Sequence, residues 1–462
     1  MKNAPRSHVL LITRSLLGCL AAAIITADVH AATPTELADD FLSSQLKKNT
    51  HPGFAVLVSR DNEILFQRAY GMANVKTKRA ITNETPFRIG SITKQFTAAA
   101  ILKLQEQGKL KIHDPLTKFF PDWPNGENIT LHHLLTHTSG LSSYTSHSRF
   151  QSQVRKPVDM LGLISSMQKA KVYFAPGEDW SYCNSGYLLL GLIVEKVSGK
   201  SYGEFLRESL FRPLGMNQSG VHRKGNEPIG ESLGYTKGLL GFKLANNWDM
   251  SWAGGAGALY STTGDLHRWN VGLFGGKVLN EDSLRAAFKP AILKDGTKTD
   301  YGYGWAIENP GKEPTVIHGG GLEGFTSFMA YSSKRKMTIV VMSNTDSSYN
   351  PESIFLQLAT LWAEKETNPD WEIDHNLVGK NYDDYVGRYD YGGAILVVTQ
   401  TDDQLFARLT DQPALEILPM ALDEFFWKIV EARVKFQRDA NGNIHHAIHH
   451  QNGEIIKAPR LR

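Results

Sequence analysis

The chain has 462 residues, of which 41% are hydrophobic and 21% charged, so it is long enough for two or three domains and is neither a disordered nor a collagen-like protein. Its formal charge is +3, and the first 31 residues contribute +2 of this through Lys2, Arg6 and Arg14 against Asp28. The remainder is nearly neutral without a long basic run, which excludes the electrostatic footprint of a nucleic-acid-binding protein.

Residues 1–31 have the pattern of a secretory signal peptide. A basic start is followed by an apolar core over residues 16–27 and by small residues that offer a cleavage site near Ala31. The apolar core is shorter than the roughly 20 residues that a membrane-spanning helix needs. Lipidation of Cys19 is the alternative, although the apolar run continues past that residue. We therefore expect an exported protein, periplasmic or secreted, whose mature chain has no transmembrane span.

The elements that follow are predicted as a helix over 34–48, strands over 53–59 and 63–70, and a polar loop over 72–86. Residues 87–94, Phe-Arg-Ile-Gly-Ser-Ile-Thr-Lys, then open a helix that is apolar on nearly every side and ends near Gly108. A helix of this kind is usually buried in the centre of a domain. We expect the rest of the domain to pack around it.

Ser91 and Lys94 carry the chemistry of this helix. Ser91 would lie at the helix N-terminus, where unpaired backbone N–H groups and the helix dipole favour developing negative charge. Lys94 follows three residues later, so its ammonium group would lie on the same face as the Ser91 hydroxyl. A serine, a lysine and a helix N-terminus are the parts of an acyl-transfer nucleophile.

The Ser-x-x-Lys pattern alone is weak, because the chain holds four copies of it. The other three begin at Ser44 in a mostly polar helix, at Ser166 in an amphipathic stretch with an exposed end, and at Ser333 in a basic turn between two strands. Only the copy at Ser91 combines a preceding glycine, a buried helix and suitable partners downstream. Ser91 is therefore the candidate nucleophile.

The rest of the chain supplies a mostly α-helical middle, a second group of strands and an all-β end. Helical and loop-like patterns fill residues 110–214, strands are predicted over 301–307, 315–318, 325–331 and 337–343, and a helix over 352–364. Strands at both ends of residues 32–365 imply an α+β domain whose sheet joins distant segments and is flanked by helices. Residues 366–379 are predicted to be a linker, and residues 380–462 a small all-β module, a curled sheet or barrel.

Further residues downstream offer what a nucleophilic serine needs: a base, an oxyanion hole and a substrate anchor. Tyr182 and Asn184 form the only Tyr-x-Asn of the chain, in a predicted loop. A tyrosine beside a lysine ammonium is expected to have a lowered pKa and to accept a proton, while the asparagine offers a donor and an acceptor. His318 follows a predicted strand and precedes glycines 319–321, which let a substrate carbonyl approach the backbone.

In this order, Ser91-Ile92-Thr93-Lys94, Tyr182-Cys183-Asn184 and His318-Gly319-Gly320 resemble the three motifs of the penicillin-recognising serine hydrolases. The similar branch contains class C β-lactamases, D-stereospecific aminopeptidases, DD-carboxypeptidases and related esterases. Accessory stretches at residues 134–141, 213–216 and 256–262 are similar too. The resemblance covers about residues 33–365 and implies a β-lactamase/transpeptidase-like fold, an antiparallel sheet with a mostly α insertion. Residues 380–462 resemble the lipocalin-like β domain that is often appended to this family.

The resemblance also implies roles for the first two motifs. Ser91 is the acylated nucleophile, and Lys94 and Tyr182 share the proton transfers. Asn184 orients Lys94 and the substrate amide. The oxyanion hole consists of the backbone N–H groups of Ser91 and Gly321.

The third motif, His318, Gly319 and Gly320, binds and orients the substrate by the same resemblance. His318 stands where many members carry lysine, and histidine offers a weaker, pH-dependent charge for a substrate carboxylate. This departure disfavours efficient β-lactamase activity and favours aminopeptidase or esterase chemistry. Cys183 fills a position that is more often serine, and its thiol is expected to be a packed small side chain rather than a second nucleophile.

Two histidine patterns invite a metal site. His133 and His137 lie four residues apart but lack an adjacent glutamate, and we expect both to be structural. In the run 445–450, His445 and His449 share one face of a predicted strand yet lie about 13 Å apart, too far to chelate one ion. Metal binding there would need a ligand from a neighbouring strand. We therefore assign no metal and no cofactor.

The sequence thus predicts an exported serine hydrolase that acts through an acyl-enzyme on D-residue-containing peptides, small esters or amides. Its partners are small-molecule or peptide substrates and not nucleic acid. A true class C-like β-lactamase or a DD-carboxypeptidase is the alternative within the same class. A non-catalytic penicillin-recognising protein that binds cell-wall peptides is the alternative from another class. The motifs specify neither the stereochemistry of the substrate nor an oligomeric state.

Overall fold

The computed structural model describes residues 33–47, 52–225, 227–239, 241–308, 314–346, 351–362, 371–379, 382–401, 403–409, 415–427, 432–451 and 454–461. These residues fall into two compact units, Leu42–Phe355 and the described parts of Met1–Phe41 with Leu356–Arg462. The predicted signal peptide, with Cys19 and Ala31, lies outside the described residues, as does the first part of the predicted linker. None of the described helices is long and apolar enough to cross a membrane.

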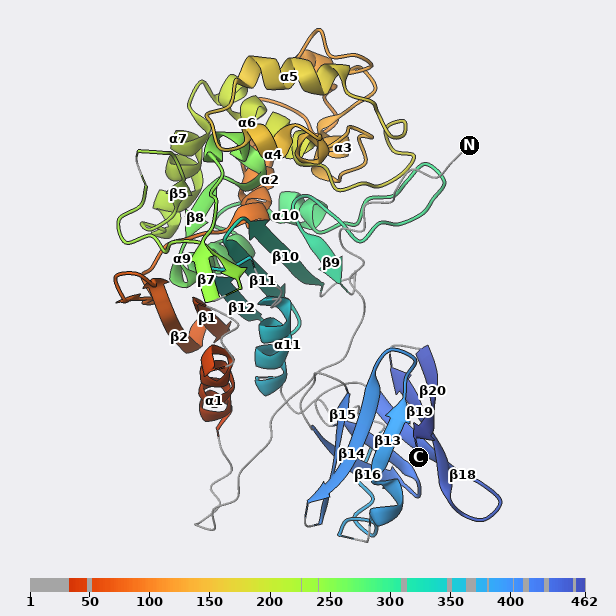
Figure 1. The fold of residues 1–462 in the computed structure, drawn as a ribbon. Helices are drawn as coiled ribbons and strands as arrows, with labels where there is room; N and C mark the ends of the chain where they lie inside the picture. The colour runs from red at the N-terminus through yellow and green to blue at the C-terminus, as the bar shows by residue number, and fades with distance from the viewer. Residues whose placement is uncertain are drawn as a thin grey trace. The chain divides into compact units, whose positions relative to one another are not determined.

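The larger unit is built on a seven-stranded antiparallel sheet (Figure 1). Its strands follow the spatial order β3 (Arg79–Ala80), β2 (Glu63–Asn74), β1 (Gly53–Arg60), β12 (Met337–Ser343), β11 (Phe325–Ser332), β10 (Thr315–Leu322) and β9 (Ala306–Glu308). β1 and β12 pair along their lengths, from Phe54 opposite Ser343 to Arg60 opposite Met337. The prediction that the sheet joins distant segments of the chain is confirmed.

The helices that lie between β3 and β9 in the sequence form the predicted α-helical part. They are α2 (Thr93–Glu106), α3 (Leu131–Leu135), α4 (Phe150–Gln153), α5 (Met160–Lys169), α6 (Asn184–Ser198), α7 (Tyr202–Leu206), α8 (Gly254–Gly257), α9 (Thr263–Phe274) and α10 (Glu281–Ala287). Eleven of the 14 residues of α2 are buried, which makes it the expected core helix. α2 packs against α6 and α8, while α9 packs on β1 and β12. The α+β class with an antiparallel sheet and an α insertion is confirmed.

Smaller elements complete the description of this unit. Two short sheets join β4 (Phe87–Arg88), β8 (Leu259–Ser261) and β5 (Gly220–Val221), and pair β6 (Tyr235–Gly238) with β7 (Gly241–Leu244). Two further helices, α1 (Pro34–Lys47) and α11 (Pro351–Leu361), extend across the boundaries between the two units.

Three local predictions differ from the structure. Ser91 lies in a 3-10 turn, η1 (Gly90–Ile92), which leads into α2, so Ser91 precedes the α-helix instead of beginning it. β10 continues past His318, the last residue of the predicted strand 315–318, because the glycines that follow it continue the ladder with β11. Of the predicted strand 301–307 only the end belongs to β9; the preceding residues form a loop in which Gly304 has a φ of +86°.

The C-terminal unit contains a closed eight-stranded barrel, which confirms the predicted all-β module (Figure 1). Its strands are β13 (Gly387–Asp390), β14 (Ile395–Thr401), β15 (Gln404–Leu409), β16 (Leu415–Ala421), β17 (Glu424–Trp427), β18 (Ala432–Arg438), β19 (Ile444–Gln451) and β20 (Glu454–Leu461). They follow one another in chain order, and β20 pairs with β13 to close the barrel. β20 is absent from the sequence prediction, since its charged residues and Pro459 give it a weak strand pattern.

Candidate active site

Ser91 lies where η1 contacts β10, and two glycines make this close approach feasible. Gly90 has a φ of +50°, and a Cβ on it would lie 2.9 Å from the backbone nitrogen of Gly321. A Cβ on Gly320 would lie 2.1 Å from the carbonyl oxygen of Ile89. Both positions therefore require glycine. The contact brings the backbone of Gly321 beside the segment that carries Ser91, and the space around the Gly321 Cα is open.

Lys94 is completely buried, and its Nζ contacts three oxygen atoms. These are the Asn184 Oδ1 at 2.9 Å, the carbonyl oxygen of Ala256 at 2.8 Å and the Ser91 Oγ at 3.1 Å. Burial lowers the pKa of Lys94 well below its usual value. A neutral amine has two hydrogens, which the Asn184 and Ala256 acceptors take. Its lone pair is then directed at the Ser91 hydroxyl, the geometry of a base that removes the serine proton.

Asn184 is held in place from both ends of its amide. Its Oδ1 accepts from Lys94, and its Nδ2 donates to the Thr145 hydroxyl at 3.1 Å. Its backbone N–H donates to the Ser143 Oγ at 3.2 Å. Asn184 thus links the first residue of α6 to Lys94 and to the loop 143–145. Of its two Nδ2 hydrogens, Thr145 takes one, and the other is left for a substrate.

Tyr182 lies beside both residues of the first motif. The Lys94 Nζ lies 4.7 Å from the centroid of the Tyr182 ring, and the Ser91 side chain acts to lower the pKa of the Tyr182 hydroxyl. The prediction of a lowered tyrosine pKa is wrong. Burial, the largest cause, raises the pKa of Tyr182, and the neighbouring Cys183 raises it further. Tyr182 is therefore a proton donor at neutral pH, and Lys94 is the group that can act as base.

His318 is buried, and both of its ring nitrogens are paired within the protein. Its Nδ1 lies 2.6 Å from the carbonyl oxygen of Gly319, so Nδ1 carries the hydrogen and donates it. Its Nε2 lies 2.8 Å from the Tyr301 hydroxyl, from which it accepts. Burial and the nearby Lys94 lower the pKa of His318 to about 3. The lowered pKa favours the neutral imidazole at neutral pH, so the pH-dependent charge predicted for this histidine would develop only in acid.

Two residues near the motifs are missing from the sequence prediction of the site. Tyr301 is buried and pairs with His318, and its ring also contacts Tyr182 at a centroid distance of 6.4 Å. His137 has a left-handed φ of +61°, and its ring lies 4.4 Å from that of Tyr182. Its Nδ1 accepts from the backbone N–H of Cys183 at 3.1 Å. A buried non-glycine residue with positive φ often marks a functional site, but no sequence pattern reveals it.

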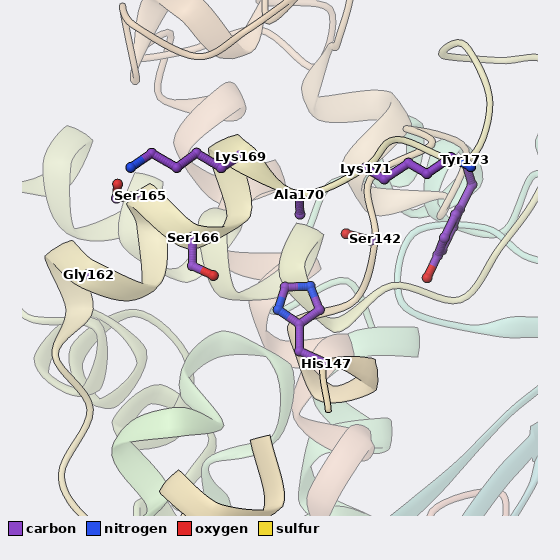
Figure 2. Close-up of a pocket in the computed structure, with 9 residues that line it drawn as sticks. All are labelled: Ser142, His147, Gly162, Ser165, Ser166, Lys169, Ala170, Lys171 and Tyr173. Atoms are coloured by element: carbon purple, nitrogen blue, oxygen red, sulfur yellow. The ribbon is translucent and has the colours of Figure 1, made fainter. Parts of the chain in front are cut away.

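Cys183 and two of the other Ser-x-x-Lys copies, those that begin at Ser166 and Ser333, have no comparable surroundings. The Cys183 thiol is buried, and burial raises its pKa, which suits an inert packed side chain. Ser166 and Lys169 line a cavity of about 640 Å³, but Figure 2 shows the Lys169 side chain extending away from the Ser166 hydroxyl. The Ser333 hydroxyl donates to the carbonyl oxygen of Pro314. These copies lack the pairing seen between Ser91 and Lys94.

The histidines considered for metal binding have other partners. His133 caps α3, where its Nδ1 accepts from the Thr130 N–H at 3.2 Å. His449 is buried in the barrel unit and pairs with Tyr391 and Gln451, both at 3.3 Å. A bulge shifts the register of β19 near its start, so the faces of the run 445–450 do not simply alternate. Across the described ranges, no group of three His, Cys, Asp or Glu residues could hold a metal ion.

Comparisons with known proteins show which family the larger part of the chain matches. A family model described as Beta-lactamase matches residues 38–359, and one described as Domain of unknown function (DUF3471) matches residues 377–457. Penicillin-binding protein 4* of Bacillus subtilis (strain 168) is 30% identical over 403 residues, 82% of this chain and 89% of that protein.

Solved structures are similar to most of the chain. The octameric penicillin-binding protein homologue from Pyrococcus abyssi has a TM-score of 0.62 and 25% identity, and the match covers 91% of this chain and 99% of that one. The D-amino acid amidase of Ochrobactrum anthropi SV3, complexed with L-phenylalanine amide, has a TM-score of 0.61 and 25% identity over 70% of this chain and 96% of its own.

Proposed function

Because this chain belongs to the Beta-lactamase family and is a serine hydrolase, we propose that it cleaves small esters and amides, including peptides with D-residues, through an acyl-enzyme on Ser91. The catalytic roles below are part of this proposal. They rest on the contacts among the three motifs and on the directions in which burial shifts their pKa values.

Acylation begins with the Ser91 hydroxyl. Neutral Lys94 takes the serine proton while the Ser91 Oγ forms a bond to the substrate carbonyl carbon. The carbonyl oxygen becomes negative and is stabilised by the backbone N–H groups of Ser91 and Gly321. Lys94 is then an ammonium ion, and the acceptors Asn184 and Ala256 stabilise its added charge.

Collapse of this intermediate breaks the bond to the leaving group. Tyr182, whose raised pKa keeps it protonated, donates its proton to the leaving nitrogen or oxygen and recovers one from Lys94. A water molecule then attacks the acyl-enzyme, with Lys94 again as base, and releases the acid and free Ser91. Asn184 would orient the acyl group through its second Nδ2 hydrogen.

The observation that carries the substrate class is the neutral, fully paired imidazole of His318. A cation at this place strengthens the binding of a carboxylate-bearing substrate, such as a penicillin or a peptide with a free C-terminus. His318 offers none at neutral pH. Together with Gly319 and Gly320 it forms an uncharged wall of β10, which suits the neutral end of an ester or amide.

The comparisons support the same choice. One structural relative is a D-amino acid amidase that was solved with an amino-acid amide, and two relatives are penicillin-binding proteins or homologues of them. We therefore place β-lactams among the slow acylating ligands of this enzyme rather than among its substrates.

The proposal includes export and the division of the chain. Residues 1–31 would be removed as a signal peptide, with lipidation at Cys19 as the alternative, and the enzyme would act in the periplasm or outside the cell. Residues 32–365 would carry the catalysis, residues 366–379 would form a linker, and residues 380–462 the barrel domain.

Intact-mass spectrometry of the full chain tests the nucleophile. We expect one adduct from a phosphonate serine probe and one from a penicillin, both absent in Ser91→Ala. No adduct from either probe would support a penicillin-recognising binding protein instead. Hydrolysis of a chromogenic cephalosporin at many turnovers per second would support a β-lactamase and overturn the proposed substrate class.

A His318→Lys variant tests the role of the neutral imidazole. We expect its rate of acylation by penicillin to rise about tenfold, since an ammonium group would then face the carboxylate, while its ester hydrolysis falls. Equal effects on both reactions would contradict the proposed selectivity.

A further inference from the structure

A second cavity of about 480 Å³ lies in the larger unit, and none of the motif residues described above lines it. Its walls come from α6, from α7, from the residues after β5, from η6 (Met250–Trp252) and from α8. The volume is within the range of about 300–1,000 Å³ that small-molecule sites occupy. Its α8 wall includes Gly254 and Gly255, which immediately precede Ala256, the acceptor of Lys94.

The body of the cavity is apolar. Leu188 and Leu192 lie on one face of α6, four residues apart, and the carboxylate-bearing Glu195 follows on that face three residues later. Met250 and Ala258 add further buried apolar surface. Such a lining favours a ligand with an aliphatic or aromatic body, because binding then removes apolar surface from water.

His222 contributes a buried imidazole ring to the wall of the cavity. It is 4% exposed, and its Nε2 lies 3.2 Å from the Glu231 Oε2. A carboxylate only accepts, so Nε2 carries the hydrogen, and in the neutral ring Nδ1 is an acceptor. Among the described residues, this Nδ1 is buried without a hydrogen-bond partner. A buried polar atom in this state is costly unless a ligand or water satisfies it.

Asp249, which also lines the cavity, supplies a carboxylate. It is 9% exposed and receives the Ser251 N–H and hydroxyl, both through Oδ1. Its second oxygen has no protein donor within the part of the chain that the structure describes. The basic residues that line the cavity, Arg223 and Lys224, are exposed, so water screens their charges. The buried polar groups therefore select for a hydrogen-bond donor with positive charge.

We propose that this cavity is a binding site for a small primary ammonium compound with an apolar body. The ammonium group donates to the Asp249 carboxylate and to the His222 Nδ1, and the apolar body packs on Leu188, Leu192 and Met250. The site is separate from the Ser91 centre and binds its ligand without chemical change.

Isothermal titration calorimetry of the full chain tests this site with three probes of similar apolar body. We expect 2-phenylethylammonium to bind with 1:1 stoichiometry, and 3-phenylpropionate and 3-phenylpropan-1-ol to bind at least tenfold more weakly. Tighter or equal binding of the carboxylate would overturn the proposal, because Arg223 and Lys224 would then decide the selectivity. Calorimetry measures binding without turnover, so the result does not depend on the proposed hydrolase activity.

Two variants locate the bound probe. Leu192→Trp fills the cavity, and Asp249→Asn keeps the shape of the side chain and removes its charge. Each is expected to weaken binding of 2-phenylethylammonium at least fivefold. Leu161→Trp, at a side chain that is 80% exposed, is the matched control and should bind like the parent. Unchanged affinity in both test variants, with ester hydrolysis and thermal unfolding like those of the parent, would place the probe elsewhere and overturn the site.

Discussion

The active-site residues of the larger unit and the Arg438 ion pairs of the barrel show opposite effects of their surroundings on charge. In the larger unit, Lys94, His137 and His318 are buried, and no carboxylate among the described residues pairs with them, so burial lowers the pKa of each toward the neutral form. In the barrel, Arg438 is near the surface and is held by both oxygens of Asp423, which raises its pKa. The ion pairs of Arg438 stabilise its charge and support the structure. Burial disfavours the charged form of groups such as Lys94, and perturbed groups of this kind are candidates for reactive residues.

The largest loss of activity is expected from a change at Lys94, the proposed base, whose pKa is lowered by burial. Lys94→Ala removes the group that takes the Ser91 proton, so kcat/KM for an ester should fall by about 10³-fold or more. In the parent enzyme, kcat/KM should fall as the pH drops through the lowered pKa of Lys94, because the protonated amine cannot act as base. Steady-state kinetics over a pH series measures both.

Lys169→Ala is the control for this prediction, since it removes the lysine of another Ser-x-x-Lys copy whose side chain extends away from its serine (Figure 2). It should keep the parent activity within about twofold. Similar losses in the two variants would mean that the pairing of Lys94 with Ser91 has no special role.

A smaller loss of activity is expected from a change at Tyr301, which contacts the motif residue His318. Tyr301→Phe removes the hydroxyl that donates to the His318 Nε2 and leaves this buried nitrogen unpaired. We expect kcat/KM to fall about 30- to 100-fold through misplacement of His318, and the pH profile of KM to change.

The matched control is Tyr303→Phe, in the same loop. The Tyr303 hydroxyl pairs with His132 at 2.9 Å instead of with a motif residue. Its removal should change kcat/KM less than fivefold. If Tyr303→Phe costs as much activity as Tyr301→Phe, the hydroxyl of Tyr301 serves the packing of the loop and not the position of His318.

The sequence predicts the architecture well, because short-range patterns of residues indicate the helices and strands. The buried helix after Ser91, the apolar strands and the recurring turns of the C-terminal module are patterns of short range, and these yield the α+β class and the barrel. Strand limits are less predictable: the glycines after His318 suggest a break, yet the ladder with β11 carries the strand through them. Pairing with a strand that is distant in the sequence decides where such a strand ends, and the sequence of the strand itself does not reveal this pairing.

In the candidate site, too, the sequence predicts some features and not others. The spacing in each motif names Ser91, Lys94, Tyr182 and His318, but the electrostatics of the group depends on burial, which the motifs do not encode. The raised pKa of Tyr182 and the neutral His318 follow from neighbours far away in sequence. Tyr301 has no motif of its own, so only the three-dimensional contact reveals it.

Burial of neutral histidine also makes stability depend on pH. An unfolded histidine takes up a proton near pH 6.5, whereas His318 resists until about pH 3. Between these values protons bind the unfolded chain preferentially, so stability falls as the pH falls. From pH 7 to pH 5, His318 alone should lower the free energy of unfolding by about 2 kcal/mol.

Urea unfolding of the parent and of His318→Gln at the two pH values measures this contribution. The variant should lose about 2 kcal/mol less than the parent between pH 7 and pH 5. Its overall stability at pH 7 is a separate quantity and does not enter the comparison. Identical pH slopes would show that His318 titrates in the folded chain as it does in the unfolded one.

The smallest effect is expected in the barrel, where charges are paired and partly exposed. The Arg438 side chain, which is 28% exposed, contacts Asp384 and Asp423. Arg438→Gln should therefore lower the stability of the barrel by only about 1 kcal/mol. It should leave kcat/KM within twofold of the parent. A tenfold loss of activity in a folded Arg438→Gln protein would contradict the division drawn here, because the barrel would then take part in the hydrolysis and its ion pairs would have a role beyond structure.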